Sequence, residues 1–221
     1  MDIVTEKSIE KLINSVLDVS KYVFERKLVS GKAGNISGRI KVDNNNVIAI
    51  TPTLMSLNRL SFNDIVLVDI NGNNIDIDSF NNIKKDNKII KNNNIKNNNG
   101  KPSSEVLMHT YIYKNRKDIN GIVHTHSPYA TGFSFSNKKL KRMEGFGKIE
   151  REFLKEIPYK KPGTIELAKH SSIAISDEDV LILKEHGVIS VGKTIEEAGD
   201  LAEFVEETAK IQFVYNTLNN I

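Results

Sequence analysis

The chain has 221 residues, of which 39% are hydrophobic, and 31 basic side chains against 28 acidic ones leave a formal charge of +3. That length can bury one sizeable α/β core, and so small a charge argues against nucleic acids or membranes as partners. The sequence contains no cysteine, which excludes disulfides, thiolate metal ligands and a cysteine nucleophile. Since no apolar stretch is long enough to span a bilayer and no signal peptide is recognised, the cytoplasm is the expected compartment.

The first half of the chain alternates between helical and strand patterns. Apolar residues at helical spacing predict an opening helix over residues 5–28. Strands are predicted over 36–42, 47–51 and 65–69, the first two joined as a hairpin by the turn 43–46. Residues 81–100 are rich in asparagine and lysine and cannot bury enough apolar surface to order themselves. We expect them to form an exposed loop insertion within a single domain of residues 1–221, with a lid role left open.

A polar segment, Ser103-Ser104-Glu105, precedes apolar residues over 106–113 whose spacing suits an amphipathic helix. Ser103 or Ser104 is the expected N-cap, and Glu105 lies in the first turn near the positive end of the helix dipole. A helix start explains these residue types on its own. Two hydroxyls at a helix N-terminus also make a ready phosphate site, and both interpretations can hold together.

Two histidines, His124 and His126, follow a short β-type run that begins at Asn120. Alternate side chains of a strand point to the same face, so the two imidazoles stand side by side and can close on one metal ion. The pattern alone favours two half-buried histidines that serve only as hydrogen-bonding groups.

A third histidine, His186, comes shortly after the apolar run 180–183, which is typical of a buried strand. A catalytic zinc site takes three protein ligands and leaves one position open, and a close pair plus one distant histidine satisfies that count. The other two histidines, His109 and His170, fall within helical patterns and are interpreted as structural.

Three more helices are predicted in the second half of the chain. They cover residues 128–136, Thr164 to Lys169 or beyond, and a terminal stretch to about residue 217. Thr194 is the expected N-cap of the last one, because Glu197 three residues later completes a capping box. Helices and strands together predict an α/β fold, a three-layer α/β/α sandwich.

Six short segments occur along the chain in a recognisable order: Gly34-Asn35-Ile36-Ser37, Ile50-Thr51-Pro52-Thr53, Ser103-Ser104-Glu105, Val123-His124-Thr125-His126, Pro162-Gly163-Thr164 and Glu185-His186-Gly187. In order and spacing they resemble the class II aldolase/adducin family, and the resemblance spans nearly the whole chain. It implies that the central sheet is mixed and largely antiparallel, and that the subunits form a homo-oligomer, commonly a tetramer with sites between neighbours.

The resemblance also implies a metal site. His124, His126 and His186 match the family's three metal-ligand histidines, and Glu105 matches the carboxylate that ligates the resting metal and acts as the acid/base. One divalent ion per subunit is therefore expected, with Zn²⁺ the first choice. A carboxylate suits proton transfer only if apolar surroundings raise its pKa or if the substrate displaces it from the metal.

A phosphate site is implied in the same way, at Gly34, Asn35, Thr53, Ser103 and Ser104. These residue types agree with the chemistry, because phosphate needs neutral donors and a close backbone approach.

The activity implied is that of a metal-dependent aldolase. It would reversibly cleave a short ketose 1-phosphate, similar to L-fuculose 1-phosphate, into dihydroxyacetone phosphate and a small aldehyde such as lactaldehyde. The metal would polarise the substrate oxygens and stabilise the enediolate, and Glu105 would carry the proton.

Other members of the superfamily supply alternatives. Sugar-phosphate 4-epimerases usually have aspartate where Glu105 stands, whereas dehydratases and decarboxylases share the three histidines. An adducin-like binding module lacks those histidines, so their presence argues against it. A metal-dependent regulator without turnover is a further alternative.

Three departures from the family pattern affect substrate recognition. Leu54 stands where the aldolases usually carry a phosphate-binding glycine, the loop 141–147 lacks their tyrosine, and the chain stops soon after Tyr215 without their C-terminal tail. Aldehyde recognition is therefore the least transferable property.

Overall fold

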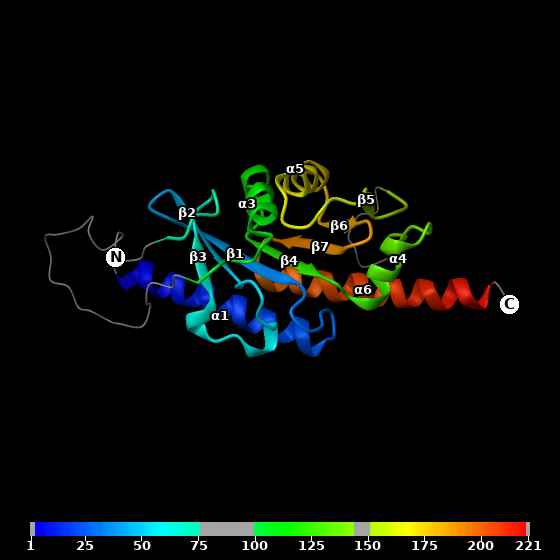
Figure 1. The fold of residues 1–221 in the computed structure, drawn as a ribbon, viewed down its shortest axis with the longest axis horizontal. Helices are drawn as coiled ribbons and strands as arrows, with labels where there is room; N and C mark the ends of the chain where they lie inside the picture. Colours follow the sequence, from blue (N-terminus) through cyan, green and yellow to red (C-terminus); the bar gives the residue numbers. More distant parts are fainter. Residues whose placement is uncertain (1–2, 76–99, 144–150, 220–221) are drawn as a thin grey trace, which may run out of the picture.

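The computed structural model describes residues 3–75, 100–143 and 151–219 (Figure 1). Seven strands form one sheet: β1 (Asn35–Val42), β2 (Asn45–Ile50), β3 (Val66–Val68), β4 (Gly121–Thr125), β5 (Lys155–Ile157), β6 (Val180–Leu183) and β7 (Gly187–Gly192). Their order is β3-β2-β1-β4-β7-β6-β5, and every neighbouring pair is antiparallel except β5 with β6. The predicted mixed, largely antiparallel sheet is therefore confirmed.

Five α-helices are described: α1 (Ile3–Glu25), α3 (Val106–Asn115), α4 (Pro128–Phe135), α5 (Ile165–Ala174) and α6 (Ile195–Leu218). In Figure 1, α3 and α5 lie on one side of the sheet and α1 and α6 on the other. Two large apolar clusters match this arrangement, one between α1 and the sheet and one between the sheet and the α3–α5 pair. The three-layer α/β/α sandwich is thus confirmed. No helix among the described residues is long and apolar enough to cross a membrane.

The hairpin between β1 and β2 places the N-terminal end of β1 in the middle of the sheet. Asp43 and Asn44 have positive φ angles of 45° and 67°, and Val42 pairs directly with Asn45. Positive φ at both central residues is typical of a two-residue type I′ turn, for which aspartate and asparagine are well suited. The strand pairing then continues from β1 to β4 and from β4 to β7.

A buried arginine fixes α3 against β1. The Arg39 guanidinium donates hydrogen bonds to the carbonyl oxygens of Tyr113, Arg116 and Ile119, at the end of α3 and in the loop that follows. The last carbonyls of a helix have no intrahelical partner, so these bonds satisfy groups that would otherwise be buried unpaired.

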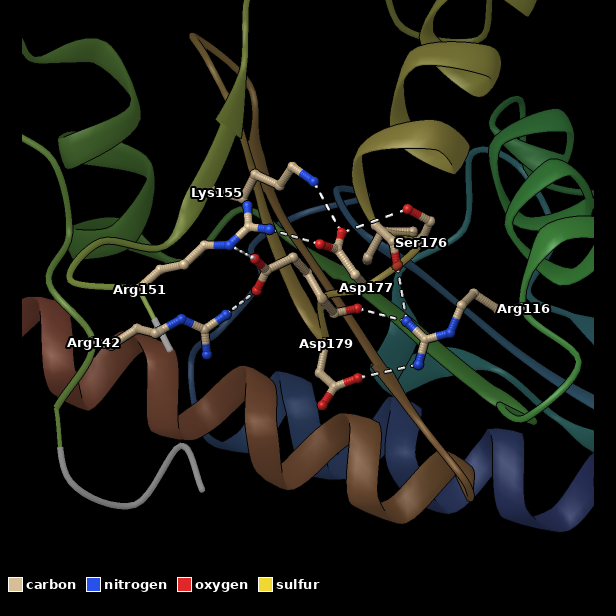
Figure 2. Close-up of polar contacts among 9 residues, drawn as sticks. Arg116, Arg142, Arg151, Lys155, Ser176, Asp177 and Asp179 are labelled. Atoms are coloured by element: carbon tan, nitrogen blue, oxygen red, sulfur yellow. Dashed lines mark hydrogen bonds and ion pairs between the residues drawn. The ribbon is translucent and has the colours of Figure 1, made fainter. Parts of the chain in front are cut away.

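Figure 2 shows a second polar network, beside the start of β6. Arg116 donates to the carbonyl oxygens of Ile175 and Glu178, while Arg142 and Arg151 form ion pairs with the Glu178 carboxylate. The network joins the end of α5 to β6, whose far end leads into His186.

Some predicted boundaries were wrong. The first helix ends at Glu25, not at residue 28, and β4 ends at Thr125, so that His126 lies just beyond the strand. The N-cap of α3 is Glu105, not Ser103 or Ser104, and the Ser103 hydroxyl accepts from the Glu105 N–H, one residue before the helix begins. Strands β5 and β7 were not predicted. Most of the segment 81–100 and of the loop 141–147 lies outside the described residues.

Candidate metal centre and its surroundings

The three predicted histidines meet at one point. His124 lies on the central strand β4, His126 directly follows it, and His186 lies in the turn between β6 and β7. The Nε2 atom of His124 is 3.0 Å from that of His126 and 3.3 Å from that of His186. The candidate ligand atoms of all three lie within 4.8 Å of one another, as ligands of a single ion must.

A glycine makes this convergence possible. A Cβ atom at Gly187 would overlap the Thr125 carbonyl oxygen and would lie 3.1 Å from the His126 ring and 3.2 Å from the His124 ring. Any other residue at this position would force the rings or the backbone apart. The close approach explains why glycine follows His186.

A hydrogen bond to the backbone determines the tautomer of His124, that is, which of its two ring nitrogens carries the proton. Its Nδ1 is 2.9 Å from the Val188 carbonyl oxygen, which can only accept, so Nδ1 carries the proton. In the neutral ring Nε2 is then unprotonated and points at the other imidazoles. A backbone carbonyl that fixes the tautomer in this way is a common support for a metal-binding histidine.

A buried carboxylate completes the group. Glu105 is only 6% exposed, its Oε2 lies 3.2 Å from His124 Nε2, and its Oε1 lies 3.6 Å from His186 Nε2. Oε2 accepts a hydrogen bond from Asn35 Nδ2, whereas the buried Oε1 has no hydrogen-bond partner among the described residues. An orphaned carboxylate oxygen facing three imidazole nitrogens fits a divalent cation.

The charges of the group also suit a cation. Burial raises the pKa of Glu105, but contact with His124 and proximity to His186 outweigh this and hold it well below its usual range. Burial, together with neighbouring His124, lowers the pKa of His126 to about 3 and that of His186 to about 4. Burial opposes protonation of His124 as well, yet Glu105 raises its pKa. Of the three rings, His124 is therefore the one that most readily takes positive charge, and it lies beside the ionised Glu105 carboxylate.

The predicted phosphate residues lie in two groups around Glu105. Loop 51–54 is paired with segment 101–103, since the Thr53 N–H donates to Lys101 and the Ser103 N–H to Thr51. Ser103 Oγ accepts from the Glu105 N–H, and Ser104 is exposed. On the other side, Gly34 (φ 80°) and Asn35 enter β1, where Asn35 pairs with His124.

Leu54 keeps a backbone conformation that suits glycine. Its φ is 61° and its side chain is 73% exposed. A non-glycine residue in the left-handed region costs of order 1 kcal/mol. Leu54 therefore has the left-handed backbone that glycine adopts most easily, with its side chain in solvent.

His109 was interpreted from the sequence as structural, and it is fully buried in α3. It also contacts the site, because its Nε2 is 2.6 Å from Asn35 Oδ1. The available sequence signal was its spacing of four residues from Glu105, which places both on one helix face. His170, by contrast, is exposed on α5.

Acid should destabilise the metal-free protein through His109. Burial, with a smaller effect of neighbouring His124, lowers the pKa of His109 to about 3 from an ordinary value of about 6.5. The unfolded chain therefore binds more protons below pH 6.5, and stability falls as the pH falls. At pH 5 the loss is about 2 kcal/mol relative to pH 7.5. Urea unfolding of chelator-treated protein at both pH values should show that much less pH dependence in His109→Gln than in wild type or the exposed control His170→Gln. Equal pH dependence in all three would contradict this.

Comparisons with known proteins agree with this geometry. Residues 14–213 match the family model described as "Class II Aldolase and Adducin N-terminal domain". A protein of Methanococcus maripaludis named L-fuculose phosphate aldolase is 37% identical over 206 residues, which cover 93% of this chain and 98% of that protein. The chain belongs to the class II aldolase and adducin family.

Within this family, both aldolases and decarboxylases are similar to the chain. A solved structure named L-fuculose 1-phosphate aldolase superposes with a TM-score of 0.77 at 25% identity, over 94% of this chain and 87% of the other. A Haemophilus influenzae protein named 3-oxo-tetronate 4-phosphate decarboxylase is 29% identical and covers 90% of this chain and 85% of its own length. The expected class, a class II aldolase enzyme, is thereby confirmed.

Proposed function

We propose that the protein is a metal-dependent aldolase that reversibly cleaves a short ketose 1-phosphate, similar to L-fuculose 1-phosphate, into dihydroxyacetone phosphate and a small aldehyde such as lactaldehyde. The observation that carries the proposal is the convergence of three histidine Nε2 atoms against the Glu105 carboxylate. In the proposal His124, His126 and His186 hold one divalent ion per subunit, Zn²⁺, with Glu105 as a ligand in the resting state.

When bound, the ion supplies Lewis-acid polarisation of the substrate carbonyl and stabilises the negative charge that develops on its oxygen. The protein supplies the proton transfer. Since Asn35 already holds Oε2 of Glu105, the unpartnered Oε1 is the atom that takes or returns the proton. Contact with His124 and His186 holds the Glu105 pKa low. The carboxylate would therefore act as a base only if substrate binding moved it away from these neighbours and from an ion held by the three histidines.

The substrate phosphate is assigned to Gly34, Asn35, Thr53, Ser103 and Ser104. The pairing of loop 51–54 with segment 101–103 supports this, because it brings the Thr53 and serine hydroxyls to the same region beside Glu105. Neutral hydroxyl, amide and backbone donors can bind phosphate while adding no positive charge that would compete with the metal ion for Glu105.

The remaining properties are proposed with the activity. We assign residues 1–221 to one domain. We also propose that the protein works as a homo-oligomer, namely a tetramer, and that its compartment is the cytoplasm. Self-association is supported by large apolar side chains exposed on α4 and the end of α6: Tyr129, Phe135, Phe213, Val214, Tyr215 and Leu218. Tyr129 and Phe213 also stack edge to face on this surface.

Phosphosugar decarboxylation is the second candidate, because one relative carries that name at 29% identity. One experiment separates the two. Zinc-loaded protein is given L-fuculose 1-phosphate or 3-oxo-tetronate 4-phosphate, and dihydroxyacetone phosphate is followed with a coupled dehydrogenase while released CO₂ is measured separately. We expect cleavage of the first compound with a turnover on the order of 1 s⁻¹ or faster. Full metal occupancy without such cleavage would refute the aldolase assignment, and CO₂ release would favour the decarboxylase.

A further inference from the structure

A buried chain of hydrogen bonds runs from Glu105 into the core. The Asn35 side-chain amide lies between Glu105 and His109, with Nδ2 2.9 Å from Glu105 Oε2 and Oδ1 2.6 Å from His109 Nε2. On the other side of the imidazole, Nδ1 is 2.7 Å from Ser37 Oγ, which in turn is 3.0 Å from the Tyr113 hydroxyl. All five residues are buried.

The chemistry of the end groups determines the direction of every bond in this chain. The Glu105 carboxylate only accepts, so the Asn35 NH₂ group faces it and the amide oxygen faces His109. That oxygen also only accepts, so His109 must carry its ring proton on Nε2. Nδ1 then accepts from the Ser37 hydroxyl. The Tyr113 hydroxyl is left as a donor, and its acceptors within reach are Ser37 Oγ and the carbonyl oxygens of Ser37 and Asn120.

The orientation of the Asn35 amide affects the Glu105 carboxylate and the substrate phosphate that was assigned to Asn35 above. One of its N–H groups is used by Glu105, and the second has no partner among the described residues. If the amide rotated by half a turn, its oxygen would face the Glu105 carboxylate. The hydrogen bond from Asn35 Nδ2 to Glu105 Oε2 would then be lost. A buried oxygen next to a carboxylate costs the desolvation and repulsion of both groups.

We propose that His109 is a positioning residue for the reaction: its Nε2–H locks the Asn35 amide with the NH₂ group toward Glu105 and toward the substrate phosphate. One N–H then holds the proton-transfer carboxylate and the other binds the phosphate. The phosphate half of this role rests on the function proposed above.

The role predicts which substitutes are tolerated. Gln at position 109 can place an amide N–H near the position of Nε2 and donate to Asn35, whereas Met fills a similar volume without a donor. Thr110 provides a matched control, since it is buried on the same helix and, within the described part of the chain, its hydroxyl bonds only to the Leu107 carbonyl. Thr110→Val therefore perturbs α3 next to His109 without touching Asn35.

Binding and turnover of these variants form the first test. Inorganic phosphate binding to the zinc-loaded proteins is measured by calorimetry, and kcat and KM are measured with L-fuculose 1-phosphate. In His109→Met we expect about 10- to 100-fold weaker phosphate binding and a comparable fall in kcat/KM, the size of one hydrogen bond to a charged group. His109→Gln should recover most of both, and Thr110→Val should match wild type. All proteins should retain one zinc per chain. A Met variant equal to wild type, or a Gln variant as impaired as Met, would overturn the proposal.

The ring tautomer is a second test that needs no substitution. Nitrogen-15 NMR of histidine-labelled, zinc-loaded protein should show His109 with its proton on Nε2, and a proton on Nδ1 would overturn the role even if the Met variant fails to fold. The two proposals fail differently. Protein that binds phosphate through this pattern but cleaves no sugar phosphate refutes the aldolase function alone. Protein that cleaves the sugar phosphate while His109→Met behaves as wild type refutes the role of His109 alone.

Discussion

Replacement of His126 by alanine is expected to remove most of the bound metal. Loss of one of three histidine ligands should weaken zinc binding by more than the roughly 100-fold that the loss of a supporting hydrogen bond costs a metal site. His126 follows the end of β4 and takes part in no strand pairing. Its truncation should therefore leave the fold intact. The metal content per chain after gel filtration, measured by mass spectrometry, is the readout.

Two comparisons make this result specific. His170→Ala removes an exposed histidine on α5 and should keep one zinc per chain. Circular dichroism should be unchanged in both variants, so that metal loss is not a consequence of unfolding. Stoichiometric zinc in His126→Ala would show that this histidine is not a ligand.

Glu105→Gln is expected to lower kcat by about 10²- to 10⁴-fold, the contribution typical of a positioned acid or base. The amide has nearly the same shape and can still accept from Asn35, but it cannot take a proton at the position of Oε1. Because three histidines remain, zinc should stay bound. Steady-state aldol cleavage and metal content, measured on the same preparation, separate the proton-transfer role from the ligand role.

Glu166 offers the matched control. It is an exposed carboxylate in the first turn of α5, where it forms an ion pair with Lys160, and Glu166→Gln removes this surface charge without replacing any proposed ligand. Its kcat should equal that of wild type. If Glu105→Gln retained full activity, the acid or base would have to be another group. If it lost its zinc, Glu105 would be needed as a ligand.

Periodicity and capping predicted most of the fold because those signals are local. Thr194 caps α6 as predicted, since its hydroxyl accepts from the N–H of Glu197 three residues later. The predicted capping box is only half formed, because the Glu197 carboxylate accepts from the N–H of Lys193 and not from that of Thr194. Strand β5 was missed because Lys155–Ile157 has only three residues and no alternating pattern. Strand β7 begins and ends with a glycine and contains the β-branched residues Val188, Ile189 and Val191, a local strand signal that was overlooked.

The same limit applies to the site. The i, i+2 spacing of His124 and His126 predicted that these two rings lie together, because the alternation of side chains along a strand is a local feature. His186 lies 62 positions from His124, and its place beside them was predicted from the ligand count and the family resemblance. The contact between His109 and Asn35 joins residues 74 positions apart and depends on how α3 packs on β1. No local pattern encodes that packing, so the hydrogen-bond chain behind Glu105 could not be predicted.

The way the sheet is assembled also has a consequence for how the protein gains its metal during folding. The residues around the proposed ion come from β1, α3, β4 and the turn before β7, and contacts within the group span 62 and 70 positions. Closing such long loops costs chain entropy, which is offset only when the strands have paired, so this step is slow. The full ligand set therefore forms late, and the ion should do little to speed folding. A bound ion would connect the end of β4, the β6–β7 turn and the start of α3. It should therefore mainly slow unfolding, which raises the kinetic stability of the native state.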